Sequence, residues 1–459
     1  MATYRTPDVY IEEISVFPPS VAEVETAIPA FIGYTEIAKK KADNDLLLKP
    51  TKIFSFKEYE NYYGNPKDDA IALSVEDDGA GGFTVSSFTE PTVQYLLYYS
   101  VKMFFDNGGG QCYIISIGDY SSAIVQGDFT DALDVLKLED EPTLIVIPEA
   151  VKLAADKYAT LVQAVLLQCN TLGDRFAIFD IFDGTTDLSA DQQSTNRGYF
   201  GSNYLKYGAA YYPFVKTTMN FYVNAGETNV AVTYPASTST PEDLVAFQTD
   251  DTALYNFVKS VLKEHFVVLP PSGAVAGVYA ATDTNRGVWK APANVSLANV
   301  IEPVIKLDNA KQDSLNVDAT SGKSIDAIRA FVGKGTLVWG ARTLAGNDNE
   351  WRYVPVRRFF NMVEESVKKS TYWAVFEPND ANLWVKVRGM IENYLTQKWR
   401  EGALAGATPK DAFFVRCGLG TTMTSQDILE GRMNVEIGMA AVRPAEFIIL
   451  KFSHKLQTS

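Results

Sequence analysis

Apolar positions follow their most regular pattern between residues 112 and 215. Four short runs in this part of the chain are apolar on both faces and rich in strand-favouring residues: 112–117, 143–148, 175–182 and 207–215. The stretches between the first three runs, 129–139 and 151–172, instead carry apolar residues at helical spacing. Buried strands that alternate with amphipathic helices are typical of βαβ units and a parallel sheet. The pattern therefore predicts an α/β domain.

Elements of the same kind precede this region. Residues 28–36 are predicted to form the first strand, and residues 51–64 a strand followed by a short helix. Two other stretches, 65–88 and 217–250, are dominated by turn-forming and polar residues. These two stretches are predicted to be surface insertions.

A further helix is predicted over residues 89–107, immediately before the first run of the regular pattern. Its apolar residues recur at helical spacing, with Thr89 as the expected N-cap and Pro91 in the first turn. Glycines at 108–110 end the pattern.

A second pattern covers residues 338–387, which contain four of the chain's six tryptophans. Two short strands are predicted here, 336–339 and 351–356, followed by a helix, an extended piece at 372–376 and a long helix over 382–401. Asp380 or Asn382 is the expected N-cap of the long helix. The block predicts a compact α+β module built around large aromatic side chains.

The two ends of the chain do not have the pattern of a domain core. Residues 6–14 alternate between apolar and polar, and a Pro-Pro pair follows. Such a segment is either a loose tail or an arm that pairs with another sheet edge. The arm is favoured because too many of its residues are apolar for a disordered tail, namely Val9, Tyr10, Ile11 and Ile14. The last predicted strand, 445–456, can pair within the molecule or between molecules, through Phe447, Ile448, Ile449, Leu450 and Phe452.

Composition narrows the class of protein. The 459 residues predict two or three domains, and 46% hydrophobic with 21% charged residues is typical of a soluble globular protein. The net charge of −15 argues against a nucleic-acid partner. The negative charge lies before residue 343, whereas the remainder is neutral to slightly basic. We expect no secretion signal and no membrane span, and three dispersed cysteines predict reduced, buried thiols.

Candidate catalytic, cofactor and metal sites were sought, and none is predicted. Two histidines, His265 and His454, offer few routes to acid–base catalysis or zinc binding. The sequence SGKS at 321–324 resembles the end of a phosphate-binding loop, but Val317 occupies the position where that loop needs glycine. A parallel α/β sheet can still bind a ligand at the carboxyl ends of its strands.

Six segments in a fixed order, together with the extended N-terminal stretch TPDVYIEEI, resemble the tail sheath proteins of contractile injection systems. They are RGVWKAPAN, VWGARTL, EWRYVPVRRFFNMVEESV, WAVFEPND, LW-x-x-VR and AFFVRCG. The resemblance implies a multi-domain α/β and α+β fold with extended arms. The domains expected from it are an N-terminal arm (1–25), an outer α/β domain (26–270), an inner domain (271–445) and a C-terminal strand arm (446–459).

The resemblance also implies a structural role without a catalytic site. Sheath subunits of this family form a helical polymer around an inner tube, joined by their arms, and contract to drive the tube through a membrane. The inner domain faces the tube, which gives a use to four basic residues of the long helix: Lys386, Arg388, Lys398 and Arg400. Baseplate and terminal cap proteins are the other expected partners, and a phage-tail-like particle made in a bacterial cytoplasm is the expected location. The alternative is a soluble α/β enzyme or ligand-binding protein.

Overall fold

Residues 20–234 and 240–450 are described by the computed structural model, which divides into two units. The smaller unit consists of Met1–Val24 and Val363–Val442, and the larger of Glu25–Met362 and Arg443–Ser459. The predicted domain boundary at residue 270 falls inside the larger unit, because strands from both sides of it share one sheet.

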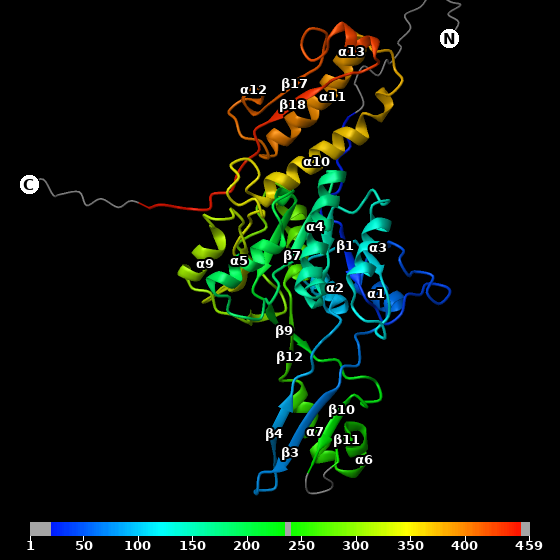
Figure 1. Cartoon of the computed structure of the whole chain (residues 1–459), viewed down its shortest axis with the longest axis vertical. Coiled ribbons are helices and arrows are strands. Elements are labelled where there is room, and N and C mark those ends of the chain that lie inside the picture. Colours follow the sequence, from blue (N-terminus) through cyan, green and yellow to red (C-terminus); the bar gives the residue numbers. More distant parts are fainter. Residues whose placement is uncertain (1–19, 235–239, 451–459) are drawn as a thin grey trace, which may run out of the picture. The chain divides into compact units, whose positions relative to one another are not determined.

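A mostly parallel sheet forms the centre of the larger unit (Figure 1). Its strands, in their order across the sheet, are β13 (Val295–Ser296), β16 (Gly335–Val338), β15 (Asp326–Phe331), β8 (Gly208–Tyr212), β7 (Phe176–Asp180), β6 (Leu144–Val146), β1 (Pro29–Gly33), β5 (Cys112–Ser116) and β2 (Thr51–Ile53). Neighbours from β15 to β5 pair in parallel, and the remaining pairs are antiparallel. The parallel part of the sheet agrees with the alternating pattern, and because the chain adds strands on both sides of β1, the sheet is doubly wound.

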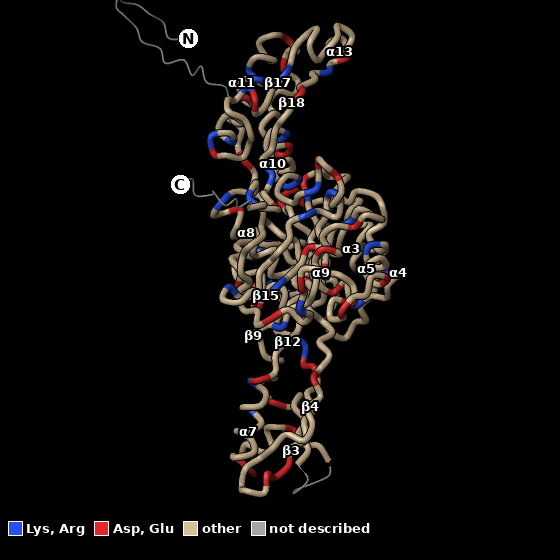
Figure 2. The backbone as a smooth tube through the Cα atoms, turned by 90° about the vertical axis from the view of Figure 1, so that its left-hand side faces the viewer, with Lys and Arg blue, Asp and Glu red and all other residues tan. Residues whose placement is uncertain are grey.

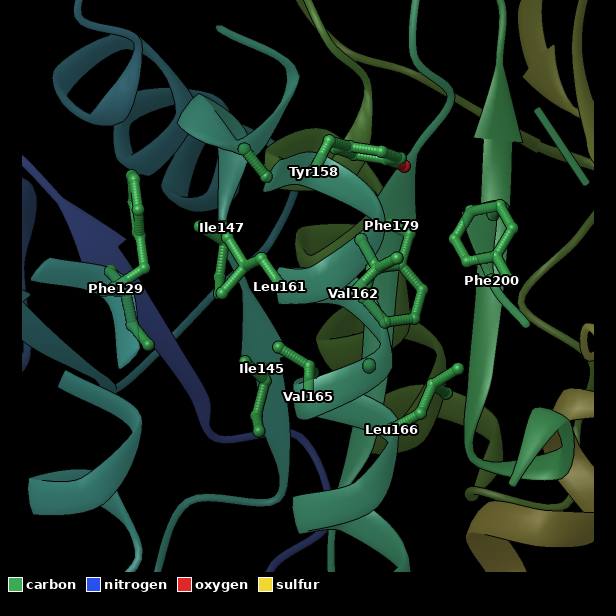
Figure 3. Packing of buried hydrophobic residues seen from close by; sticks show 14 of the residues in the cluster. Phe129, Ile145, Ile147, Tyr158, Leu161, Val162, Val165, Leu166, Phe179 and Phe200 are labelled. Carbon is green, nitrogen blue, oxygen red and sulfur yellow. The ribbon is translucent and has the colours of Figure 1, made fainter. Parts of the chain in front are cut away.

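Helices cover both faces of this sheet. One face carries α3 (Gln126–Leu136), α4 (Ala155–Leu172) and α5 (Ala190–Tyr199), and the other carries α1 (Phe56–Tyr63), α2 (Leu97–Asp106) and α8 (Ser272–Arg286). Because side chains alternate along a strand, Ile145 faces α4 whereas its neighbours Leu144 and Val146 face the opposite helices. Figure 3 shows Val162 and Val165 of α4 packed in the first of these two layers.

The predicted helix at 89–107 begins later than expected. Thr89 is the last residue of a strand, and helix α2 starts only at Leu97. The backbone N–H groups of Leu96 and Leu97 donate to the Glu149 carboxylate. A side chain from another part of the chain therefore does the work of the N-cap, which a local sequence pattern cannot indicate.

The two predicted insertions come together in one module. Their strands form a separate sheet in the order β11 (Glu242–Asp243), β10 (Val230–Thr233), β3 (Ile71–Asp77) and β4 (Phe83–Thr89). Two helices pack on this sheet, α6 (Phe247–Asp250) and α7 (Thr252–Leu262), through buried residues that include Leu73, Val232 and Val258. A further small sheet joins β12 (Phe266–Leu269), β9 (Val215–Asn220) and β14 (Val300–Pro303), and α9 (Asn309–Asn316) precedes β15.

The smaller unit combines a long helix with short helices and a two-stranded sheet. Its elements are α11 (Ala381–Arg400), α12 (Pro409–Ala412), α13 (Ser425–Leu429) and the antiparallel strands β17 (Phe413–Arg416) and β18 (Glu436–Met439), and α10 (Val354–Ser370) leads into it. The predicted N-cap is confirmed, because Asp380 accepts a hydrogen bond of 2.9 Å from the backbone N–H of Leu383.

One predicted strand and one predicted extended piece of this region are wrong. Residues 351–356 do not form a strand, because α10 begins at Val354 and Pro355 fits the first helical turn. The segment 372–376 contains the short 3-10 helix η4 (Tyr372–Ala374) in place of an extended piece.

Candidate assembly surfaces

The C-terminal segment carries the most exposed apolar run of the described chain. Phe447, Ile448, Ile449 and Leu450 are 70%, 79%, 78% and 73% exposed. They pair with no strand of the described residues. Consecutive exposed apolar residues of this kind are typical of interaction sites. The predicted arm residue Phe452 lies outside the described residues.

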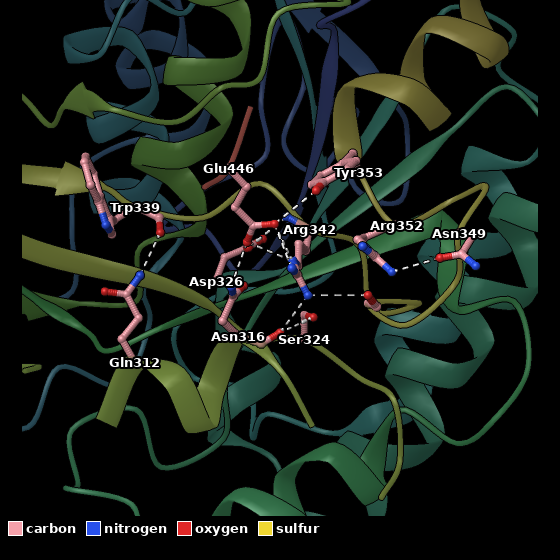
Figure 4. A network of polar contacts seen from close by, with 11 residues as sticks. Gln312, Asn316, Ser324, Asp326, Trp339, Arg342, Asn349, Arg352, Tyr353 and Glu446 are labelled. Carbon is pink, nitrogen blue, oxygen red and sulfur yellow. Dashed lines mark hydrogen bonds and ion pairs between the residues drawn. The ribbon is translucent and has the colours of Figure 1, made fainter. Parts of the chain in front are cut away.

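The polar residue just before this run is held firmly in the larger unit. Glu446 accepts hydrogen bonds from Arg342 Nη2 (2.7 Å), Asn316 Nδ2 (2.7 Å) and the Tyr353 hydroxyl (3.0 Å), as Figure 4 shows. Burial of the Glu446 carboxyl raises its pKa, but these hydrogen bonds and the Arg342 charge outweigh burial and lower the pKa overall. Glu446 is therefore an ionised anchor in the C-terminal segment.

The described start of the N-terminal segment lies along helix α10 in the smaller unit. The backbone N–H of Ala22 donates to Ser370 Oγ (3.0 Å), and that of Val24 donates to Ser366 Oγ (3.1 Å). These bonds fix the base from which the predicted N-terminal arm extends. The arm residues themselves lie outside the described residues: Val9, Tyr10, Ile11 and Ile14.

Three of the four predicted basic residues of α11 face solvent at least in part. Lys386 and Arg400 are exposed, and Arg388 is half-buried with Glu392 at 3.8 Å. Figure 2 marks the charged positions along the backbone.

Lys398 corrects the prediction for this helix face. It is only 4% exposed and forms ion pairs with Glu23 and, at 2.6 Å, with Glu401. The reason is helical geometry: Lys398 lies four residues after the buried Tyr394, on the apolar side of α11. Lys398 therefore fastens the N-terminal segment inside the smaller unit and does not belong to an exposed basic face.

The strands β17 and β18 form the small sheet of the same unit. Phe414 lies opposite Gly438, and Val415 lies opposite Ile437. No other strand of the described residues pairs with either of their outer edges. Both edges therefore present backbone groups to which further strands can add.

Many α/β proteins bind a ligand where the order of the strands in the sheet reverses. In the central sheet a side chain, that of Glu149, occupies this position. The order of the strands reverses between β1 and β6, and Glu149 lies there in the short 3-10 helix η1 (Pro148–Lys152) that follows β6. Its carboxylate is fully buried and accepts hydrogen bonds from the backbone N–H groups of Tyr34 (2.9 Å), Leu96 (2.9 Å) and Leu97 (3.1 Å). A Cβ on Gly33 would lie 2.6 Å from Glu149 Oε2, so this approach requires glycine. The crevice is thus closed by the protein's own carboxylate.

Glu149 is one of three buried carboxyl groups with raised pKa values. Burial raises the pKa of Glu149 to about 7, although its three backbone hydrogen bonds lower it. Burial likewise raises the pKa of Asp180 to about 7 and that of Asp326 to about 8. Asp180 accepts the backbone N–H of Ser272 at the start of α8, and Asp326 accepts that of Arg342. Each group therefore joins two segments of the fold.

A cavity of about 180 Å³ lies beyond the carboxyl ends of β7 and β8. Its walls are mostly apolar, with Phe214, Phe266 and Val268 among them, and Lys152 and Glu90 also line it. Pockets for drug-sized ligands are larger, about 300–1,000 Å³. This cavity is the place where the alternative of a ligand-binding protein would be tested.

In residues 20–234 and 240–450, no group of three or more His, Cys, Asp or Glu side chains is arranged to hold a metal ion. None of the helices within the same ranges combines the length and the apolar character required to cross a bilayer.

A family model covers the last four of the six segments described above. Residues 346–455 match the family model of the phage tail sheath C-terminal domain. The tail sheath protein of Enterobacteria phage T4 is 28% identical over 130 residues, which are 28% of this chain and 19% of that protein. A putative prophage major tail sheath protein of Pseudomonas aeruginosa is 28% identical over 109 residues, 23% of this chain and 27% of that protein. These curated relatives are therefore matched over about a fifth to a quarter of their length.

Solved structures extend the similarity to the whole chain. The sheath complex of the extracellular contractile injection system PVC, in its contracted state, contains a chain that is 31% identical, with a TM-score of 0.66 and coverage of 99% of both chains. The chain belongs to the tail sheath family of contractile injection systems. The helical sheath of the anti-feeding prophage in its contracted state is 30% identical to the subunit, with a TM-score of 0.67 and coverage of 99% of this chain and 100% of that one. The mixed α/β fold and the role of a sheath subunit are both confirmed.

Two long-range contacts of the subunit are not indicated by its sequence. The Arg342–Glu446 pair and the Glu149 cap each join segments that are far apart in the chain. The available signal was a charge within an apolar context: Glu446 precedes four apolar residues, and Glu149 follows the run 143–148. A charged residue that becomes buried among apolar residues needs a hydrogen-bonding or charged partner. The sequence does not identify that partner.

Proposed function

We propose that copies of this subunit polymerise into a helical sheath around an inner tube and that contraction of the sheath drives the tube through a target membrane. The observation that carries the proposal is the similarity over 99% of the chain to a sheath in its contracted state. A polymer that changes length without dissociating requires strong links between rigid subunits. The segments described above have the properties of such links.

The links are strands that one copy adds to the sheet of another. The exposed run at 447–450 supplies a strand without a partner, and the open edges of β17 and β18 offer a place for it. The N-terminal arm residues Val9, Tyr10, Ile11 and Ile14 have the alternation that suits a second added strand. Main-chain hydrogen bonds join an added strand to the sheet that receives it. The strand can stay in that sheet while the subunit that supplied it rotates, so the link persists.

Helix α11 is the proposed surface toward the inner tube. Lys386 and Arg400 lie on one exposed side of this helix, and Arg388 lies half-buried on another side, in a chain with a net charge of −15. Exposed ion pairs contribute only about 0–1 kcal/mol each. Contacts of this strength hold the tube during assembly and separate when the sheath contracts.

Other partners and the location follow from the relatives. A chain in the baseplate of the anti-feeding prophage is 31% identical over 99% of this chain, which supports contact of the subunit with a baseplate. We extend this to a terminal cap protein and to a phage tail or phage-tail-like particle assembled in a bacterial cytoplasm. In this proposal the subunit is not an enzyme, needs no cofactor, binds no nucleic acid and does not insert into a membrane itself.

Electron microscopy of the subunit expressed alone tests this function. We expect long hollow cylinders from the full chain, and a folded but unassembled protein after deletion of residues 1–16. The double substitution Ile448→Asp and Ile449→Asp should have the same effect, because charged residues cannot replace the apolar face of an added strand. Circular dichroism checks that each variant is folded.

Leu138 provides the matched control, because it is 83% exposed but lies outside both arms. The variant Leu138→Asp should assemble as the full chain does. A full chain that stays monomeric under all conditions, or arm variants that form ordinary cylinders, would contradict the proposal. A small molecule that raises the melting temperature of a strictly monomeric protein would support the ligand-binding alternative.

A further inference from the structure

The C-terminal segment turns one side chain inward just before its exposed run. The Glu446 side chain is 22% exposed, whereas each of the four residues that follow is at least 70% exposed. Among the described residues, the backbone hydrogen bond nearest before this point joins Val442 N–H to the Ala403 carbonyl in the smaller unit. Glu446 is therefore the fixed point nearest to the exposed run.

The groups that receive Glu446 form a complete site for a carboxylate. Arg342 Nε donates to Oε1 (3.0 Å) and Nη2 donates to Oε2 (2.7 Å), which is a two-point contact with the guanidinium. Asn316 adds a second bond to Oε1, and Tyr353 adds one to Oε2 (Figure 4). Paired contacts of this kind fix the direction of a carboxylate as well as its position.

The residues that bind Glu446 are held in place by contacts that do not involve the C-terminal segment. The Arg342 side chain is 5% exposed, and its Nη1 donates to the backbone carbonyl of Asn316 (3.2 Å). Its backbone N–H donates to the buried Asp326 (2.9 Å). The three donors come from the end of α9, the loop after β16 and the residue before α10, so tertiary structure holds them in place. A buried guanidinium without a carboxylate partner is costly, and this favours retention of Glu446.

We propose that Arg342, Asn316 and Tyr353 form an anchoring site for Glu446 and that this site sets where the C-terminal strand leaves the subunit to reach a neighbouring copy. The inference rests on the proposed function, in which residues 447–450 add to the sheet of another copy.

The anchor lowers the entropic cost of docking the strand. From Glu446, residues 447–450 reach about 14 Å when fully extended, at roughly 3.3–3.6 Å per residue. Without the anchor the free segment begins at Val442 and doubles in length, so the strand samples a larger volume and docks less often. Fixing one end of the strand in advance therefore strengthens assembly without any contact to the neighbour.

The test replaces Glu446 with its uncharged isostere. The variant Glu446→Gln should raise the critical concentration for polymerisation, measured by sedimentation, about tenfold. Tyr353→Phe removes one of the hydrogen bonds and should raise it about threefold. Arg443→Gln is the matched control, because Arg443 is an exposed charge in the same segment, and it should change the critical concentration less than twofold.

A second measurement uses the unassembled subunit. A nitroxide label on Ala445→Cys should become more mobile in Glu446→Gln and should not change in Arg443→Gln. Equal label mobility in all variants would overturn the anchor, whether or not polymers form. Normal assembly of Glu446→Gln, together with loss of assembly in Ile448→Asp/Ile449→Asp, would overturn the anchor and leave the proposed function intact. Absence of polymers from the full chain would instead overturn the proposed function.

Discussion

Glu149 shows how one side chain can organise three elements. Its carboxylate receives the backbone N–H of Tyr34 beyond β1 and those of Leu96 and Leu97 at the start of α2. It therefore ends a strand, begins a helix and fills the crevice between them. In an α/β protein that binds a ligand at this point, anionic groups of the ligand occupy the equivalent position. In this subunit the backbone N–H groups at this position bind the protein's own Glu149 carboxylate and stabilise the fold.

Removal of this carboxylate should destabilise the subunit strongly. Glu149→Ala leaves three buried N–H groups without an acceptor, and each costs about 1–3 kcal/mol. We expect the free energy of unfolding of the unassembled subunit to fall by about 4 kcal/mol in urea denaturation. Glu149→Gln keeps one acceptor oxygen and should lower it by about half as much.

Glu264 offers a matched control in the same unit, since it is exposed. Glu264→Ala should change the free energy of unfolding by less than about 0.5 kcal/mol. If Glu149→Ala is as stable as Glu264→Ala, the three hydrogen bonds do not hold α2 in place.

At the scale of elements, local pattern predicted most of the larger unit. The helix predicted over 151–172 is confirmed as α4, which begins four residues later, at Ala155, and buries Tyr158, Val162 and Cys169. The pattern succeeded because these elements bury a face whose period can be read from the chain. It failed at Thr89, where a distant carboxylate sets the start of the helix, and at 351–356, where strand-favouring residues are overridden by packing of α10.

The arm strands and the tube-facing helix stay predictions, and the structure corrects one residue of them, Lys398. Exposure of the apolar run at 447–450 agrees with an arm, since sequence composition shows such a run directly. The burial of Lys398 did not follow from composition, because a basic residue on a helix can lie on either face once a partner such as Glu23 is present. Long-range pairs of this kind need tertiary structure to be identified.

The three solvent-accessible basic residues of α11 lead to a prediction about tube binding. Lys386→Glu, Arg388→Glu and Arg400→Glu together should reduce the amount of inner tube that co-sediments with the sheath at least tenfold, because attraction to an acidic tube becomes repulsion. Polymers of the subunit alone should still form. At high salt the wild-type sheath should also lose bound inner tube, as the variant does, since salt screens exposed charges.

A triple reversal elsewhere provides the control for this helix. Lys41→Glu, Lys57→Glu and Lys137→Glu change the net charge equally in exposed parts of the larger unit. Tube binding should change less than twofold in this variant. Equal loss of tube in both variants would mean that total charge, and not α11, governs the contact.

At the scale of the whole molecule, the three buried carboxyl groups act together on stability. Each has a pKa in the folded protein well above that of an exposed carboxyl group, about 7 for Glu149 and Asp180 and about 8 for Asp326. The folded state therefore binds more protons than the unfolded state between about pH 4.5 and pH 8. This contribution to stability is fully present below the unfolded pKa values and is lost as the pH rises through the folded ones.

The unassembled subunit should accordingly unfold more easily at pH 8.5 than at pH 5.5. Carboxyl groups with lowered pKa values, such as Asp380 and Glu446, lose their contribution only in more acidic solution, so they do not reverse the trend in this window. Urea midpoints at pH 5.5, 7.0 and 8.5 measure the effect. Asp180→Asn removes one titrating group and keeps an acceptor for the Ser272 N–H, so its urea midpoint should change less with pH than that of the wild type. A midpoint that rises with pH would show that these carboxylates are stabilised as anions by their hydrogen bonds, in which case burial is not the dominant influence on their ionisation.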